Sequence, residues 1–390
     1  MNQRFYSLDV FRGATVALMI LVNNPGSWRH IYAPLKHAPW HGCTPTDLVF
    51  PFFLFAVGNA LAFVMPRLKA AGTKVFLQKV IKRTVLIFLI GLFLNWWPFI
   101  RWSDEGLVFK YWVDPVNPDN GIRILGVLQR IALAYCLASM IIYFFKIRGA
   151  FLIGVLLLML YWWLCLAFGS PADPFSLQGW FGNDIDRSVL GIPHIYKGEG
   201  VPFEPEGIAS TLAAVVQVIF GYLVGDYIQK KGRNTEMLTH LFVAGCMLVL
   251  TALCWEMVLP INKKIWTSSY VLYTTGLAIL VISVMIHLIE FRKWHGAWTK
   301  FFDVFGKNPL FIFFFSGFLP RLLALIRWKD HVSEQGVTEY TSPLPWFYEH
   351  ICKPLFDNLK NGSLLYAISL VVFYWAICYW LDRRKIYIKV

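Results

Sequence analysis

The run TDLVFPFFLFAVGNALAFVMP, residues 46–66, decides the class of fold. After Asp47 it contains no further charged residue. A helix needs about 20 predominantly apolar residues to cross the hydrocarbon core of a bilayer, and this run has that length. The sequence therefore predicts a membrane-spanning helix from Asp47 to Pro66.

The composition of the whole chain supports the same class. Hydrophobic residues make up 57% of the 390 residues and charged residues only 15%, whereas an ordinary soluble domain carries about a quarter charged residues. The formal net charge is +13, but Lys and Arg fall in short clusters between apolar runs rather than on one amphipathic face. We therefore expect lipid, and not nucleic acid, as the environment of this chain.

Ten segments are apolar and approach the length of a span. They predict an all-α, polytopic integral membrane protein with about ten transmembrane helices, and no repeat or linker divides residues 1–390 into more than one domain. The segments are Leu8 to Asn24, Asp47 to Pro66, Thr84 to Ile100, Leu125 to Phe145, Ala150 to Phe168, Ile208 to Ile228, Leu238 to Leu259, Trp266 to Ile289, Pro309 to Ile326 and Leu364 to Leu381.

The loops between these segments predict the orientation. Lys and Arg are more numerous in the alternate loops that include both tails, with Arg4 and Lys389, than in the opposite set. Positively charged loops stay in the cytoplasm, so both termini are expected there. The external loops gather Pro, Gly, Trp and acidic residues, as in Arg101 to Asn120, Gly169 to Glu206 and Trp328 to Asn361. Long loops on one face commonly carry function.

Charged residues inside the predicted spans are candidate functional residues, because a charged side chain is costly to bury in lipid unless it is paired. Arg12 follows Asp9 by three residues, a helical spacing that predicts an ion pair. Arg123 and Arg130 lie two turns apart on one face of the predicted fourth span, with Gln129 beside the latter. A phosphate-bearing ligand would suit two buried arginines. Pairing with an acidic residue is the alternative; the candidates are Asp47, Glu206 and Asp226.

The most polar stretch, residues 23–47, contains His30, His37 and His41 between Asn23 and Asp47. A histidine is the side chain most easily used as a base near neutral pH, and a partner on its second nitrogen fixes its tautomer. A general base oriented by an Asn or an Asp is therefore predicted. No metal site is expected, since the three histidines are not spaced for a shared helical face and no H-E-x-x-H occurs. The chemistry alone leaves the choice among the three histidines open.

A second polar cluster, PINKKIWTSSY, covers residues 260–270. Thr267 or Ser268 could cap the eighth predicted span. Lys263 and Lys264 could equally attract an anionic ligand. The sequence leaves both readings open.

Several motifs resemble those of one family. They are SLDVFRG from Ser7, VNN from Val22, KHAPWHG from Lys36, TDLVFPFFLFAVG from Thr46, GVLQR from Gly126, FEPEG from Phe203 and NKKIWTSSY from Asn262. Together they resemble the heparan-α-glucosaminide N-acetyltransferase family, from the first predicted span to at least the eighth.

The resemblance implies a membrane acyltransferase that moves an acetyl group from cytoplasmic acetyl-CoA to an amino sugar, or a related saccharide or oligosaccharide, on the far side of the membrane. The family's catalytic histidine corresponds to His37 through KHAPW, and its accompanying asparagine corresponds to Asn23 through VN; Asp47 completes the expected catalytic group. The general base could act directly or His37 could carry the acetyl group. The residues expected to contact CoA are Arg123, Gln129, Arg130, Asn262, Lys264, Trp266 and Ser268.

The chain begins almost directly at its first predicted span, without the large N-terminal portion of the lysosomal animal members. In this respect it resembles bacterial relatives, so the bacterial inner membrane is the expected location. A homodimer is an open alternative to a monomer. The rival interpretation is a transporter for a sugar or anionic solute, in which intramembrane Arg and Asp line a path without covalent chemistry. The histidine-rich stretch favours the enzyme.

Overall fold

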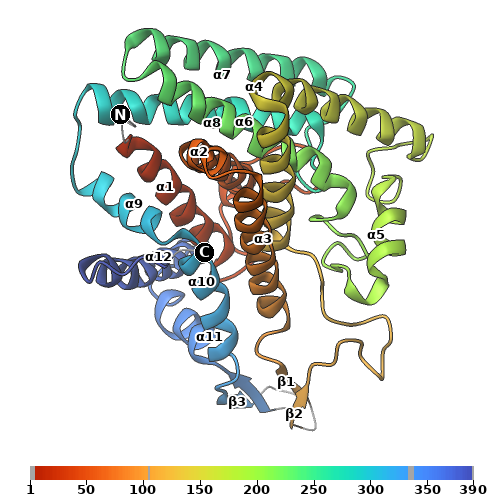
Figure 1. Cartoon of the computed structure of the whole chain (residues 1–390). Coiled ribbons are helices and arrows are strands. Elements are labelled where there is room, and N and C mark those ends of the chain that lie inside the picture. The colour runs from red at the N-terminus through yellow and green to blue at the C-terminus, as the bar shows by residue number, and fades with distance from the viewer. Residues whose placement is uncertain (1–4, 104–105, 333–337, 389–390) are drawn as a thin grey trace.

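The computed structural model describes residues 5–103, 106–332 and 338–388, which are mostly helical. Arg4 and Lys389, which entered the predicted orientation, lie outside the described residues. The α-helices, drawn in Figure 1, are α1 (Tyr6–Asn23), α2 (Val49–Ala70), α3 (Thr73–Trp96), α4 (Val127–Phe168), α5 (Gly182–Leu190), α6 (Ile208–Lys231), α7 (Thr235–Glu256), α8 (Ser268–Ile286), α9 (Ala297–Lys307), α10 (Pro309–Leu323), α11 (Pro343–Phe347) and α12 (Leu359–Arg383). Short 3-10 and π-helical turns are η1 (Ala33–Leu35), η2 (Pro45–Leu48), η3 (Ile192–His194), η4 (His287–Phe291) and η5 (Tyr348–Cys352).

Each of the ten predicted segments overlaps one of these helices. Within the described ranges, seven helices are long and apolar enough to cross a membrane. An eighth span is present if α9 and α10, which meet at a bend of 79°, count as one. The number ten is not reached because α4 holds two predicted segments and α3 is not among the seven. The count of about ten therefore stays a prediction.

Helix α4 is interrupted at Lys146, between the two segments predicted from its sequence. Lys146 has φ 58° and ψ −170°, far from helical values. Figure 1 shows the two halves of α4 running in clearly different directions. The polar residues between the two apolar runs thus mark a real change of direction.

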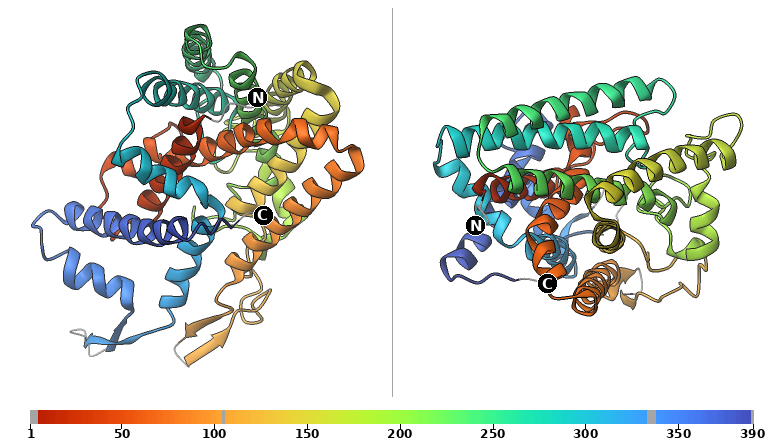
Figure 2. Two further views of the ribbon diagram at one scale, coloured as in Figure 1. Left: turned by 60° about the vertical axis from the view of Figure 1, so that its left-hand side comes forward. Right: turned by 45° about the horizontal axis from the view of Figure 1, so that its top comes forward.

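Helices α2 and α6 approach each other closely at the centre of the largest core. A Cβ atom built on Gly58 would lie 2.1 Å from the Val218 carbonyl oxygen, and one on Gly221 would lie 2.2 Å from the Phe55 carbonyl oxygen. Small residues allow helix backbones to pack at such short range in membranes. Helices α7 and α8 also pack side by side, as the right panel of Figure 2 shows.

Helix α1 packs against α9, and their contact contains the ion pair that the spacing predicted. The Arg12 Nη2 atom lies 2.7 Å from Asp9 Oδ1, and its Nε atom donates to the Gly306 carbonyl oxygen at 2.8 Å. A Cβ atom on Gly306 would lie 2.3 Å from the Asp9 carbonyl oxygen. The pair therefore sits where the two helices touch.

Two antiparallel hairpins depart from the all-α prediction. Strands β1 (Ile100–Ser103) and β2 (Gly106–Phe109) form one, with Ile100 opposite Phe109. Strands β3 (Trp328–Val332) and β4 (Thr338–Thr341) form the other, with Trp328 opposite Thr341. Both lie in loops predicted to be external, where alternating polar and apolar residues pair locally. The Arg327 guanidinium lies 3.6 Å from the Trp102 ring centroid and so links the two hairpins.

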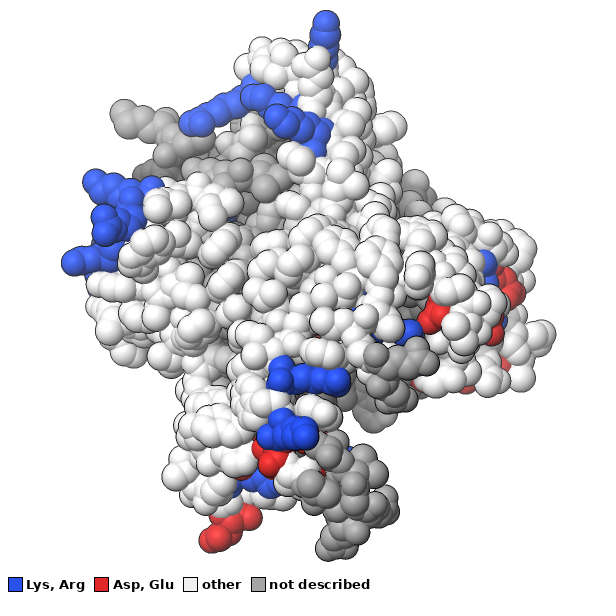
Figure 3. Space-filling model, turned by 90° about the horizontal axis from the view of Figure 1, so that it is seen from below, with Lys and Arg blue, Asp and Glu red and all other residues white. Residues whose placement is uncertain are grey.

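The outer surface suits a lipid environment. Large apolar side chains face outward along several helices, among them Leu156 and Trp163 of α4, Met247 of α7 and Phe373 of α12. On the face shown in Figure 3, charged side chains form small separate groups, and a broad uncharged area extends between them. Such a distribution is expected when the middle of each span meets hydrocarbon.

Candidate active site

The stretch that carries the three histidines is folded around the carboxylate of Asp47. This side chain is 1% exposed, and its Oδ2 atom accepts hydrogen bonds at 3.0 Å from the backbone N–H groups of Ala38 and Thr44. The Thr44 hydroxyl also donates to Oδ2 at 3.0 Å. Asp47 thereby forms a capping box with Thr44 at the start of η2. One carboxylate oxygen organises the loop, and the other is left for His37.

His37 lies directly against Asp47. Its Nδ1 atom is 2.6 Å from Asp47 Oδ1, and its side chain is 40% exposed. A buried carboxylate accepts rather than donates, so Nδ1 carries the proton. In a neutral imidazole, the Nε2 atom is then the nitrogen with the free lone pair, which can act as a base.

Lys263 completes this group from a distant part of the chain. Its Nζ atom is 3.0 Å from His37 Nδ1 and 3.3 Å from Asp47 Oδ1. Burial lowers the pKa of Lys263 below its usual range, while the charges of Asp47 and Glu206 act in the opposite direction. A histidine, a carboxylate and a lysine thus meet at one point.

The segment before α8 is held against the histidine stretch by a backbone bridge. The Gly42 N–H donates to the Ile261 carbonyl oxygen at 2.7 Å, and Gly42 pairs with Asn262. Gly42 has φ +99°, a conformation that suits glycine. The buried Asn262 accepts the Ile265 N–H at 3.1 Å and its Nδ2 atom lies 3.3 Å from His41 Nδ1. Asn262 therefore shapes the segment that carries Lys263 and Lys264.

A cavity of about 230 Å³ opens beside His37, and we call it the histidine cavity. Its lining residues include His37, Trp40, Asp47, Arg123, Tyr196, Glu199, Glu206, Lys263, Lys264 and Trp266. The Lys264 Nζ atom contacts Glu199 Oε2 at 2.6 Å and the Pro39 carbonyl oxygen at 2.7 Å. The buried ring of Trp266 forms part of the wall. Five of the ten predicted site residues meet here: His37, Asp47, Arg123, Lys264 and Trp266.

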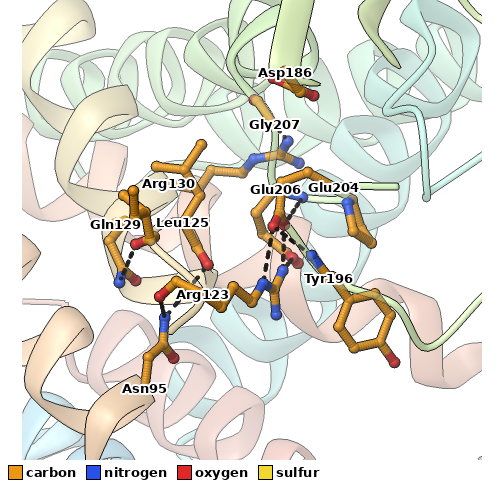
Figure 4. Close-up of polar contacts among 12 residues, drawn as sticks. Asn95, Arg123, Leu125, Gln129, Arg130, Asp186, Tyr196, Glu204, Glu206 and Gly207 are labelled. Atoms are coloured by element: carbon orange, nitrogen blue, oxygen red, sulfur yellow. Dashed lines mark hydrogen bonds and ion pairs between the residues drawn. The ribbon is translucent and has the colours of Figure 1, made fainter. Parts of the chain in front are cut away.

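Arg123 forms another part of this wall, and Figure 4 shows it between Glu204 and Glu206. Its guanidinium binds both carboxylates and lies 4.8 Å from the Tyr196 ring centroid. Burial opposes the charge of Arg123, but the two carboxylates outweigh it and raise the pKa above its usual range. Burial raises the pKa of Glu204, whereas Arg123 holds that of Glu206 below its usual range. Arg123 therefore has acidic partners, Glu206 among them, as one of the two readings predicted. A contact of Arg123 with a phosphate-bearing ligand stays a prediction.

The structure corrects the position predicted for Arg123. This residue precedes α4, which begins at Val127, so it does not share a helical face with Arg130. The Arg123 carbonyl oxygen accepts from Asn95 Nδ2 at 2.9 Å, and the Gln129 side chain donates to the Ile124 carbonyl oxygen at 2.8 Å. These two side-chain amides hold the segment between Gly121 and Gly126 outside the helix. Helix α4 therefore starts later than the apolar pattern predicted.

Arg130 is fully buried in α4 and lines neither of the cavities described here. It donates to the Ser210 hydroxyl and to the Gly207 carbonyl oxygen at 3.3 Å, and lies 5.0 Å from the Trp266 ring centroid. Its Nε and Nη1 atoms have no hydrogen-bond partner among the described residues. A role of Arg130 toward CoA therefore stays a prediction.

A second cavity, of about 410 Å³, contains Asn23, Asn24, Asn95, Gln129 and Arg321, and we call it the asparagine cavity. Arg123 lines it as well and so forms a shared wall with the histidine cavity. The predicted residues Asn23 and Gln129 therefore line a different cavity from His37. The nitrogen of His37 that faces Asp47 is not oriented by Asn23.

The remaining polar residues singled out from the sequence make contacts that stabilise the fold or lie away from His37. The Ser268 hydroxyl donates to the Leu158 carbonyl oxygen at 2.8 Å and ties α8 to α4. Thr267 occupies the N-cap position of α8, but its hydroxyl donates to the Pro260 carbonyl oxygen at 2.8 Å instead of capping the helix. His30 lines a different, much smaller cavity. Burial lowers the pKa of His41, while Asp173 opposes the shift.

Glu204 is a site residue that sequence reasoning did not select, and Lys263 was named only beside Lys264 as a lysine that could attract an anionic ligand. Both lie within motifs already noted, NKKIWTSSY and FEPEG. Only the contact with His37, a residue 226 positions away in the chain, distinguishes the role of Lys263 from that of Lys264. Among the described residues, no group of three or more His, Cys, Asp or Glu is arranged to hold a metal ion.

Comparison with known proteins supports the resemblance seen in the motifs. Residues 4–182 match the family described as "Heparan-alpha-glucosaminide N-acetyltransferase, catalytic". Along 99% of its length the chain is 26% identical to the heparan-alpha-glucosaminide N-acetyltransferases of Homo sapiens and of Mus musculus. The chain spans about 60% of the length of these curated relatives. Its apolar helices and this similarity identify an integral membrane protein.

Proposed function

We propose that this chain, similar along nearly its whole length to heparan-α-glucosaminide N-acetyltransferases, is a membrane acetyltransferase that uses acetyl-CoA. The acceptor is an amino sugar or a related saccharide at the external face. Both termini are cytoplasmic, about ten helices span the bilayer, and the protein resides in a bacterial inner membrane. The single observation that carries the proposal is the contact of the half-exposed His37 with the buried Asp47 at a cavity wall.

The chemistry that we propose follows from the tautomer of His37. Its Nε2 atom removes a proton from the acceptor amine while the amine nitrogen attacks the carbonyl carbon of the acetyl thioester. The C–N bond forms, the C–S bond breaks, and the CoA thiolate leaves and takes up a proton. In the alternative route, Nε2 itself attacks the thioester and passes the acetyl group to the acceptor in a second step.

The two cavities that share Arg123 both offer groups that can bind the substrates. The asparagine cavity offers amides from Asn23, Asn95 and Gln129, groups that can hydrogen-bond a thioester carbonyl or sugar hydroxyls. We propose that Asn23 contacts the reacting groups from that side and that the CoA contacts include Arg123 and Gln129. Lys264 and Trp266 contact the donor from the histidine cavity.

The test uses purified protein with radiolabelled acetyl-CoA and a panel of acceptors. Glucosamine, galactosamine and a glucosaminide disaccharide supply an amine, and glucose is the matched acceptor without one. We expect label in an amino sugar, in a reaction that His37→Ala abolishes. Folded parental protein that transfers label to none of these acceptors would contradict the proposal. Label recovered on His37 after brief mixing without acceptor distinguishes the two-step route from direct transfer.

A further inference from the structure

The charges around the histidine cavity cancel in three pairs. Its acidic side chains are Asp47, Glu199 and Glu206, and its basic side chains are Arg123, Lys263 and Lys264. Lys263 lies 3.3 Å from Asp47, Lys264 lies 2.6 Å from Glu199, and Arg123 binds Glu206. Each of these acids therefore contacts a cation, although Arg123 is shared with Glu204 behind the wall. The six charged residues that line the cavity have a formal charge of zero when the imidazole of His37 is neutral.

Of these three pairs, the one between Asp47 and Lys263 also touches His37. The Nδ1 atom lies 2.6 Å from Asp47 Oδ1 and 3.0 Å from Lys263 Nζ. An ammonium can only donate, and the Nδ1 proton is directed to Asp47, so Lys263 donates to the carboxylate instead. The cation thus lies beside the imidazole without a hydrogen bond to its lone pair.

We propose that Lys263 is a positioning residue that keeps His37 in its neutral, base-competent form. Asp47 alone would favour a protonated imidazolium, because a buried carboxylate stabilises an adjacent cation. Lys263 balances that carboxylate, so a proton added to His37 would leave one excess positive charge in the cavity wall. The inference rests on the proposed function, since it assigns a role within the same site.

The fold holds Lys263 at this point with little freedom. Its neighbour Asn262 is buried and anchored to Gly42, and Trp266 is buried behind it. The Lys263 side chain is 21% exposed. Burial disfavours the cation and lowers the pKa of Lys263, while the charges of Asp47 and Glu206 oppose that shift. Lys264 cannot substitute, because Glu199 and the Pro39 carbonyl oxygen hold its ammonium.

The first test measures the protonation of His37 without any substrate. Diethyl pyrocarbonate acylates unprotonated imidazole, so peptide mass spectrometry of the full-length protein gives the modification of His37 against pH. For Lys263→Met we expect the midpoint to rise by about one pH unit, since a cation next to the ring has been removed. Lys263→Arg keeps the charge and should return the midpoint to that of the parent. The curve for His30 in the same samples should not move.

The second test measures acetyl transfer from acetyl-CoA to glucosamine against pH. We expect Lys263→Met to shift the acidic limb of kcat to higher pH and to lower kcat about tenfold near neutrality, because more of His37 is protonated. The KM for acetyl-CoA should change less than twofold, and Lys263→Arg should restore most of the activity. Lys353→Met is the matched control, as it breaks a surface ion pair with Glu349.

The outcomes separate the two claims. An unchanged His37 midpoint in folded Lys263→Met would overturn the role of Lys263, and so would a Lys263→Arg protein as shifted as Lys263→Met. Lys263→Gln serves as the neutral variant if Lys263→Met does not purify in folded form. If the parent transfers no acetyl group to any acceptor, the proposed function fails, while the modification curve still decides the charge balance at His37.

Discussion

At the scale of single residues, the orientation of the His37 ring depends on the different contacts that the two oxygens of Asp47 make. Oδ2 is used by the backbone of residues 38 and 44, and Oδ1 faces His37. A carboxylate that is held by backbone donors cannot rotate away from the imidazole. The tautomer of His37 is therefore fixed before any substrate binds.

We expect His37→Ala to lower turnover by about two to four orders of magnitude, the usual contribution of a general base. Binding of acetyl-CoA, measured by equilibrium dialysis with the labelled donor, should be retained. His30→Ala is the matched control, since His30 lines a separate cavity and should keep substantial activity. Near-parental turnover of His37→Ala would remove the mechanistic assignment and leave the family resemblance intact.

Asp186, in helix α5, which the predicted orientation places outside, should make stability depend on pH. Burial raises its pKa to about 7, and one oxygen accepts the Ile208 N–H at 2.7 Å while the other has no partner among the described residues. Between about pH 4 and pH 7 the folded state keeps a proton that the unfolded chain has released. Stability should therefore fall as pH rises through that window and level off above it.

Asp186→Asn removes this titration. As the pH rises from 5 to 8, the midpoint of thermal unfolding should therefore decrease more in the parent than in the variant. Intrinsic fluorescence in detergent provides the measurement. Asp184→Asn, on the exposed side of the same helix, should follow the parent. Parallel curves for Asp186→Asn and the parent would show that Asp186 does not titrate in this range.

At the scale of elements, glycines set the distance between the helices that carry the site. The short approach of Gly221 to the Phe55 carbonyl oxygen leaves no room for a methyl group. Helix α6 starts just after Glu204 and Glu206, and α2 starts just after Asp47. The packing of α2 on α6 therefore also sets the spacing of the acidic groups at the cavity.

We expect Gly221→Ala to destabilise the protein by about 1 to 3 kcal/mol, because an overpacked contact forces the two backbones apart. Its thermal unfolding midpoint in detergent should drop clearly. Gly154→Ala is the matched control, since a Cβ there would meet its nearest neighbour at 3.4 Å, an ordinary contact. Equal midpoints for Gly221→Ala and Gly154→Ala would show that α2 and α6 adjust without cost.

At the scale of the whole molecule, the site is assembled from segments that are far apart in the chain. The histidine stretch, the segment before α4, the turn around residue 204 and the segment before α8 meet at the histidine cavity. All four are loops or helix starts. A rigid helical scaffold that presents loop residues is the usual way to build such a site.

The predicted orientation can be tested by labelling engineered cysteines from outside intact cells. Lys74→Cys, at the start of α3, should be protected, whereas Val189→Cys, in helix α5 of the segment predicted to be external, should react with an impermeant maleimide. Both side chains are exposed, so protection would report on the membrane and not on packing. The parent, with its native free cysteines, gives the background. Equal labelling of both sites would refute cytoplasmic termini.

The sequence by itself determined the helical segments, because hydrophobicity over about 20 residues is a local property that needs no knowledge of neighbours. All ten predicted segments overlap helices, including the two halves of α4 on either side of Lys146. The Asp9–Arg12 pair was predictable for the same reason, since its spacing is that of one helical turn. The motifs also selected His37, although only by resemblance.

The tertiary structure alone decided which residues meet. Nothing in the local pattern says that Lys263 lies beside His37, that Arg123 binds Glu204 and Glu206, or that Asn23 falls in a different cavity from His37. These contacts depend on how closely the helices pack and on a single backbone bridge between Gly42 and Asn262. Such long-range distances are set by the packing of the whole bundle, which a pattern along the chain does not record.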